Sequence, residues 1–136
     1  MKKIRKSLVC FYDRAGRTLM QDRRNYKKGS EFGFFGGSME KDETPETALL
    51  REIEEELSIK LRQFDFVKEF KEITQEHDLI FYLYAAPLPS SEERVCKEGK
   101  PVFTTLDNAL LLDLAERGKL ILKEYISWLK KTDRIV

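Results

Sequence analysis

Three glutamates in one short segment are the residues of this chain best suited to chemistry. Glu52, Glu55 and Glu56 lie in the stretch GGSMEKDETPETALLREIEEELSI, which spans residues 36–59. In a helix, their spacing places all three side chains on one face, where like charges destabilise the helix by about 0.2–0.5 kcal/mol per pair. Arg51 alone cannot neutralise three carboxylates. Hard oxygen ligands of this kind suit Mg²⁺ or Mn²⁺, so the cluster predicts a divalent metal site, with a solvated acidic helix face as the alternative.

The element that must position these glutamates is a helix with clear start signals. Thr44 is a suitable N-cap, Pro45 has no donor to lose in the first turn, and Glu46 favours the positive end of the helix dipole. We therefore predict that the helix begins near Pro45. At about 100° per residue, its apolar side is formed by Leu49, Leu50, Ile53 and Leu57.

The same segment closely resembles the sequence box of the Nudix hydrolase family. That box contains, in order, Gly, Glu, Arg, Glu, an aliphatic residue, Glu, Glu, Gly and an aliphatic residue. The chain matches it at all positions but one, with Gly37, Glu43, Arg51, Glu52, Ile53, Glu55, Glu56 and Ile59. The departure is Ser58, where the family has a glycine just after the helix, a position that often needs left-handed backbone. A serine there costs about 1 kcal/mol if the backbone is unchanged.

The resemblance implies a role for each charged residue of the box. Glu52, Glu55 and Glu56 would bind Mg²⁺ or Mn²⁺, and Glu52 is also a candidate base for the attacking water. Arg51 and Glu43 would hold the preceding loop against the helix.

Two further metal ligands are expected from the same resemblance. Gly36 and Gly37 are interpreted as a tight turn that brings backbone close to the metal, with the Gly36 backbone as a ligand. Glu98 lies in a region where some family members supply another carboxylate. The alternatives are an ordinary turn and a solvated glutamate.

Candidate substrate contacts lie outside the helix. Arg23 and Arg24 end a predicted strand before the glycines, where a guanidinium could bind phosphate oxygens, although a solvated strand end is the alternative. Phe35 beside the glycines, and Phe81, Tyr82 and Tyr84 on a later strand, are candidates to stack on a base. Alternating aromatic residues on a strand are more often core.

The implied reaction is metal-dependent attack of water on a nucleoside diphosphate linked to another group. The chain contains no additional motif that we recognise for ADP-ribose, dinucleoside polyphosphates, coenzyme A or NADH. We therefore expect a pyrophosphohydrolase for a nucleoside triphosphate, intact or damaged. The alternatives are an ADP-ribose, sugar-nucleotide or dinucleoside-polyphosphate pyrophosphatase, and a non-catalytic nucleotide-sensing module. The last usually lacks one or more box glutamates, and here all three are present.

Composition agrees with a single enzyme domain over residues 1–136. The chain is 41% hydrophobic and carries a formal charge of +1, which does not favour a nucleic-acid polymer as partner. The apolar run after the basic amino terminus is too short for a signal peptide, and no stretch approaches the roughly 20 apolar residues of a membrane span. Cys10 and Cys96 are too few for a disulfide framework. We expect a cytoplasmic protein with reduced thiols, and leave a homodimer open as one alternative.

Hydrophobic periodicity predicts an α/β (α+β) architecture. We expect strands at residues 3–12, 17–24, 31–35, 61–74, 79–86, 93–97 and 101–105. Even spacing of Phe64, Phe66 and Phe70 predicts one buried face for the fourth strand, and the fifth should be central. A leucine-rich helix over 107–117, capped by Asp107 and stopped by Gly118, should precede a final helix. A mixed sheet between helices matches the α/β/α sandwich of the resembled family.

Overall fold

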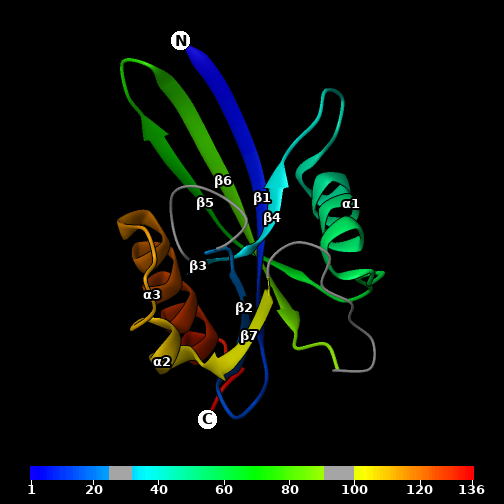
Figure 1. The fold of residues 1–136 in the computed structure, drawn as a ribbon, viewed down its shortest axis with the longest axis vertical. Helices are drawn as coiled ribbons and strands as arrows, with labels where there is room; N and C mark the ends of the chain where they lie inside the picture. The colour runs from blue at the N-terminus through cyan, green and yellow to red at the C-terminus, as the bar shows by residue number, and fades with distance from the viewer. Residues whose placement is uncertain (25–31, 91–99) are drawn as a thin grey trace.

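The computed structural model describes residues 1–24, 32–90 and 100–136. Its elements, in chain order, are β1 (Lys2–Tyr12), β2 (Arg17–Asp22), β3 (Phe32–Gly33), β4 (Phe35–Ser38), α1 (Pro45–Leu57), β5 (Asp65–Ile73), β6 (His77–Pro87), β7 (Lys100–Thr105), α2 (Leu106–Ala109) and α3 (Glu116–Lys131) (Figure 1). Among these helices, none has the length and apolar content needed to cross a membrane.

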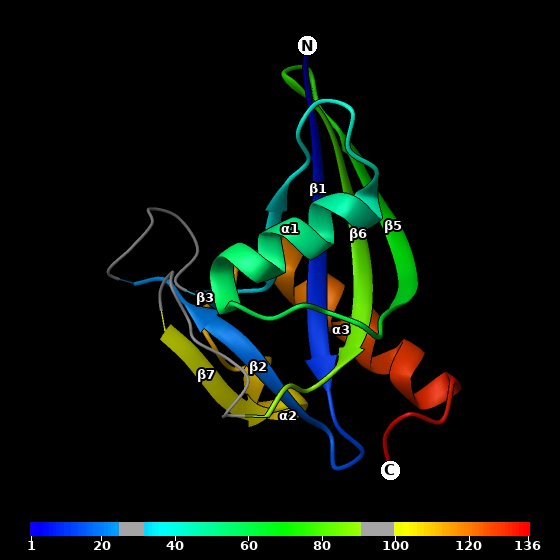
Figure 2. The same ribbon diagram turned by 90° about the vertical axis from the view of Figure 1, so that its right-hand side faces the viewer.

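The central sheet has the strand order β4-β1-β6-β5, and β3-β2-β7 form a second, smaller sheet. β1 and β6 pair in parallel over their full length, whereas the other pairs are antiparallel. Helix α1 lies on one face of the central sheet and α3 on the other (Figure 2). Each helix closes its own hydrophobic cluster against the sheet. The predicted mixed sheet between helices is confirmed, as is the central position of β6.

Helix α1 begins where the sequence predicted, because Thr44 and Thr47 form a reciprocal capping box at its first turn. The Thr44 hydroxyl accepts a hydrogen bond from the Thr47 amide at 3.2 Å, and the Thr47 hydroxyl accepts one from the Thr44 amide at 2.9 Å. The helix ends at Leu57, and the backbone of its C-cap residue, Ser58, is left-handed at φ 58° and ψ 33°. Ser58 therefore adopts the conformation that the family's glycine would favour, with the steric cost of a side chain.

Strand β5 does not have the single buried face that the sequence predicted. Phe66 packs edge-on against Tyr84 on the α1 side, whereas Phe70 packs against the cluster beneath α3. A register irregularity between Phe66 and Lys68 explains the change of face, because one extra residue inverts the alternation of all that follow. β5 is also an edge strand, and most of its residues are exposed.

The predicted helix over 107–117 is wrong. Thr105, not Asp107, caps α2, which lasts only four residues. The chain then turns, and Gly118 lies inside α3 rather than ending a helix. Consecutive leucines at 110–112 cannot all face one core from a helix, and Leu111 is 83% exposed.

The other strand predictions need smaller changes. The segment predicted as one strand over 31–35 contributes instead to two strands in different sheets, β3 and β4. The strand predicted at 93–97 lies outside the described residues.

Candidate active site

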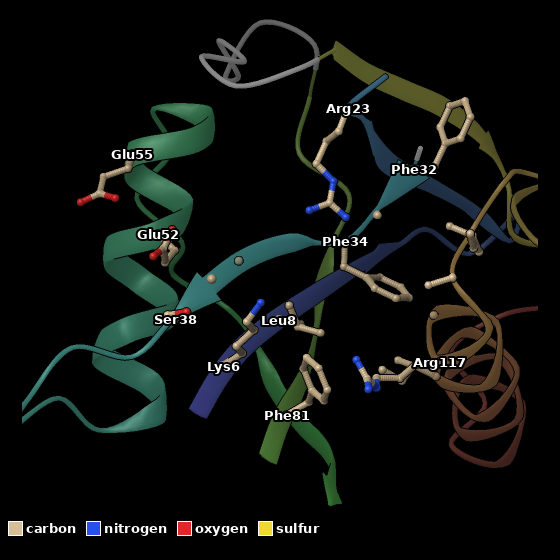
Figure 3. A pocket seen from close by; sticks show the side chains of 17 residues that line it. Lys6, Leu8, Arg23, Phe32, Phe34, Ser38, Glu52, Glu55, Phe81 and Arg117 are labelled. Carbon is tan, nitrogen blue, oxygen red and sulfur yellow. The ribbon is translucent and has the colours of Figure 1, made fainter. Parts of the chain in front are cut away.

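A cavity of about 680 Å³ extends from the acidic face of α1, over β4, to the first turn of α3. Glu52 and Glu55 line it from α1, while Phe81 and Arg117 line it from β6 and α3 (Figure 3). This volume is within the range of about 300–1,000 Å³ that is usual for small-molecule sites. The cavity thus brings two of the three predicted carboxylates, Glu52 and Glu55, into one space with residues distant in sequence.

The two glycines beside the carboxylates lie in β4, not in the tight turn that the sequence suggested. Gly36 pairs with Leu8 of β1 and Gly37 with Ser7. Gly36 has φ 131°, and a Cβ there would overlap the Ser7 carbonyl oxygen. A side chain at Gly36 is therefore excluded by backbone, and the reason for glycine is close strand approach rather than a turn.

Gly37 is required for a different reason, namely the position of Glu52. A Cβ on Gly37 would lie 2.6 Å from both the carboxyl carbon and Oε1 of Glu52. The Glu52 carboxylate therefore rests directly against the Gly37 backbone at the cavity wall. The absence of one side chain on β4 determines where this carboxylate lies.

Arg51 joins the loop before α1 to the helix. Its Nε and Nη2 each donate to a carboxylate oxygen of Glu43 at 2.8 Å, and Nη2 also donates to the Ser38 carbonyl at 3.0 Å. The Arg51 guanidinium, together with the Glu40 amide, lowers the pKa of Glu43 to about 2. The same carboxylate raises the pKa of Arg51. Arg51 and Glu43 thus join the loop to the helix, which is the arrangement that the family resemblance implies.

Arg51 also compensates the charge of two box glutamates. Its Nη1 lies 3.1 Å from Glu52 Oε1 and 3.4 Å from Glu55 Oε2. One guanidinium therefore holds the two cavity carboxylates near each other and reduces their mutual repulsion.

Glu56, the third box glutamate, is turned away from the cavity. It is only 2% exposed, and its Oε1 accepts a hydrogen bond of 2.7 Å from the Gly36 amide. Its Oε2 accepts one of 3.2 Å from the Gln21 amide group. Within the described parts of the chain, no three His, Cys, Asp or Glu side chains are grouped so as to hold one metal ion. These hydrogen bonds to Gly36 and Gln21 keep Glu56 apart from Glu52 and Glu55.

The donor set at the cavity nevertheless fits Mg²⁺ or Mn²⁺. Glu52 and Glu55 supply carboxylate oxygens at the cavity wall, and the Gly36 and Gly37 backbone borders the same space. The donors available there are hard oxygens, the ligands that these ions prefer. The cradle above Gly37, which a Cβ would fill, holds the Glu52 carboxylate at the edge of this space.

Of the two arginines predicted to contact substrate, only Arg23 reaches the cavity. Its guanidinium lies against Gly33 and points into the space (Figure 3). Its Nε is buried and has no hydrogen-bond partner within the described part of the protein. Arg24 instead pairs with Asp22 at 2.8 Å and lies over the Phe32 ring, outside the cavity lining.

The predicted substrate contact by Phe35 is wrong. Phe35 is fully buried beneath α1, with its ring centroid 6.0 Å from that of Phe11. Tyr82 likewise packs on the α1 side and does not line the cavity. Their neighbours Phe34 and Phe81 line it instead. Successive side chains of a strand point to opposite faces, so each adjacent aromatic pair supplies one core residue and one cavity residue.

Several residues of the site were missed by reasoning from the sequence, among them Arg117, Phe34 and Gln21. Arg117 lines the cavity from α3, where its guanidinium lies 5.2 Å from the Phe81 ring centroid and 2.7 Å from Glu72. No sequence signal marks it, because its position depends on how α3 docks. Phe34 could have been found from strand alternation, and Gln21 from its amide within an apolar strand. Glu98, the other predicted metal ligand, lies outside the described residues.

Comparison with known proteins gives a consistent result. The family model described as NUDIX domain matches residues 2–129. No curated protein sequence matches. Among solved structures, the E. coli ORF135 protein is 25% identical, with a TM-score of 0.74 and coverage of 97% of this chain and 94% of that one. A MutT structure from work on Aliivibrio salmonicida and Vibrio cholerae is 20% identical, with a TM-score of 0.76 and coverage of 93% and 98%.

A third neighbour has a ligand in its description. The NUDIX domain of Shewanella oneidensis NrtR, solved with ADP ribose, is 14% identical, with a TM-score of 0.74 and coverage of 95% of this chain and 90% of that one. The two neighbours below 25% identity establish the fold alone, whereas the family model covers nearly the whole chain. Together with the box on α1 and β4, this match shows that the chain belongs to the Nudix family of hydrolases.

Proposed function

We propose that this protein is a metal-dependent pyrophosphohydrolase whose substrate is a nucleoside triphosphate, intact or damaged. The observation that carries the proposal is that Glu52 and Glu55 of α1 line the cavity into which the Arg23 guanidinium points. In such a reaction, carboxylates bind the divalent metal ion, and a guanidinium binds the phosphate oxygens of the substrate.

Metal binding would fall to Glu52 and Glu55, with the Gly36 backbone and, after rearrangement, Glu56. A divalent ion at these oxygens supplies charge neutralisation of the phosphates and a lower pKa for the attacking water. Arg51 lies between Glu52 and Glu55 and pairs with both. When these two carboxylates bind the metal ion instead, the ion pair with Glu43 would keep Arg51 in place.

Substrate orientation would rest on the opposite part of the cavity. Arg23 has an unused donor for a phosphate oxygen, since its buried Nε lacks a partner among the described residues. Phe34 and Phe81 offer apolar surface for a base, and aromatic rings bind such planar groups by stacking. Glu52, which lies against Gly37, would accept a proton from the attacking water, and exclusion of bulk water from the cavity would strengthen the charge interactions there.

The experiment is turnover of a substrate panel with Mg²⁺, with Mn²⁺ and with chelator. The panel contains nucleoside triphosphates, oxidised triphosphates, ADP-ribose, sugar nucleotides and dinucleoside polyphosphates. We expect nucleoside monophosphate and pyrophosphate from a triphosphate, with activity lost on chelation. Glu52→Gln should abolish turnover, whereas Glu54→Gln, an exposed change on the same helix outside the cavity lining, should not.

Other outcomes would contradict specific parts of the proposal. Hydrolysis of ADP-ribose without hydrolysis of any triphosphate would show that the substrate is a nucleoside diphosphate linked to a sugar and not a nucleoside triphosphate. Tight nucleotide binding without turnover of any compound would favour the sensing module. Full activity of Glu52→Gln would refute the assigned role of that carboxylate.

A further inference from the structure

We propose that β5 is a homodimer interface, in which the edge strands of two copies pair antiparallel about Phe70. Among the described strands, β5 has β6 on one side and none on the other, and it lies at the outer edge of the sheet (Figure 2). An unpaired edge presents backbone N–H and C=O groups that can bind another strand. The side chains of β5 determine which partner strand can pair with this edge.

The charge pattern of β5 is complementary to itself. In an antiparallel pair centred on Phe70, Lys68 of one copy lies opposite Glu72 of the other, and Glu69 lies opposite Lys71. The dyad repeats both pairs, so four charge pairs are attractive. Opposite charges directly across two strands stabilise the pairing, and like charges destabilise it.

Neighbouring registers lack this complementarity. A shift of one residue in either direction would set Lys68 against Lys71, or Glu69 against Glu72, which lie on opposite faces of β5. The pleat of a continuous sheet does not allow such pairs. A further step either way places Glu69 or Lys71 opposite its own copy, and parallel in-register pairing places every charge opposite itself. Charged residues commonly protect edge strands from other chains. Here they would oppose these alternatives and favour one register.

The two faces of the paired strand support the same register. Lys68 and Glu72 lie on the α3 face, where they already pair with Glu124 and Arg117 at 2.8 and 2.7 Å. On the α1 face, Glu69 and Lys71 form an ion pair with each other at 3.4 Å, and both side chains are exposed. They are therefore the pair that would gain most from a second copy.

Exposed apolar residues lie at both ends of this charged segment. Phe66 is 52% exposed and Ile73 is 70% exposed, although both are large hydrophobic side chains. Phe66 contacts Tyr84 on the α1 side, and alternation places Ile73 on that side as well. The dyad about Phe70 brings Phe66 of each copy to the end occupied by Ile73 of the other. Pairing would therefore cover apolar surface at both ends.

The first test is the oligomeric state by sedimentation velocity and light scattering, from low micromolar to near-millimolar protein. We expect a reversible dimer. Lys71→Glu makes two attractive pairs repulsive and should raise the dimer dissociation constant at least about tenfold. The double variant Glu69→Lys/Lys71→Glu should restore the dimer, because it exchanges the charges without removing the pairs. Lys60→Glu, the same charge change at an exposed position outside β5, should have no effect.

A second test identifies the register and does not depend on Lys71→Glu remaining folded. Glu69→Cys and Lys71→Cys, each combined with Cys96→Ser, should form a disulfide-linked dimer only when mixed, since position 69 faces position 71 of the other copy. The proposal is overturned if wild type stays monomeric throughout, if Lys71→Glu still dimerises, if the charge exchange fails to restore the dimer, or if either cysteine variant cross-links alone as well as the mixture does.

Discussion

Alanine substitutions at the adjacent glycines Gly36 and Gly37 should have different effects, one mainly on catalytic rate and the other mainly on stability. Gly37→Ala places a Cβ 2.6 Å from the carboxyl carbon and Oε1 of Glu52, whereas ordinary contacts begin at 3.4 Å. The carboxylate must therefore retreat by about 0.8 Å. A misplacement of about 1 Å can cost about 100-fold in rate, or about 2.7 kcal/mol in the activation barrier.

Stability should change little in Gly37→Ala, since the clash is with the end of a flexible side chain and Gly37 has no positive φ. Removing a glycine also restricts the unfolded chain, so we expect a change within about 1 kcal/mol, or about 4 °C in Tm. Gly36→Ala is the matched control. Its φ of 131° and its overlap with the Ser7 carbonyl should cost at least about 3 kcal/mol, lowering Tm by about 10 °C.

The assays are kcat for the preferred nucleotide with saturating metal, and Tm by circular dichroism. The reasoning predicts a folded, slow Gly37→Ala enzyme and a destabilised Gly36→Ala protein. Full kcat in Gly37→Ala would show that the Glu52 position is not set by this glycine. An unchanged Tm in Gly36→Ala would show that the close approach of β4 to β1 is not required.

Three further predictions concern stability and reactivity. Ser58→Gly should raise the free energy of unfolding by about 1 kcal/mol in urea titrations, because glycine relieves the left-handed backbone, whereas a Ser58→Ala protein that gained as much would contradict this cause. The pKa of Glu43 is lowered in the fold, so its ion pair with Arg51 contributes stability above the ordinary pKa of 4.5 and loses it as pH falls toward about 2. The urea midpoint of wild type should accordingly exceed that of Glu43→Gln above pH 4.5, and the difference should shrink as the pH falls from 4.5 toward about 2. A difference that does not change with pH would refute the assigned role of this ion pair. Burial raises the pKa of the Cys10 thiol to about 12, so iodoacetamide should modify Cys10 only in denaturant, as read by mass spectrometry.

Much of the candidate site was predictable, since its signals are local. Thr44 and Pro45 predict the start of α1, and the helical period places Glu52 and Glu55 on one face. The ion pair between Arg51 and Glu43 was expected from the family resemblance of the box. What could not be predicted is which way a strand residue faces, because one bulge or register shift inverts it. Phe70 was misplaced for that reason. Phe35 was misplaced because alternation shows that Phe34 and Phe35 face opposite ways, but not which of the two faces the core.

The sequence by itself determined the family, the mixed α/β architecture and the helix that carries the carboxylates. These depend on residue type and spacing within short segments, and the family match over residues 2–129 confirms them. Only the tertiary structure decided the composition of the cavity. Arg23 follows β2 and Arg117 lies in the first turn of α3, and the fold brings both to the same cavity, whereas Glu56 is held outside it by hydrogen bonds from Gly36 and Gln21. Contacts between residues far apart in sequence depend on register and docking, which no local pattern encodes.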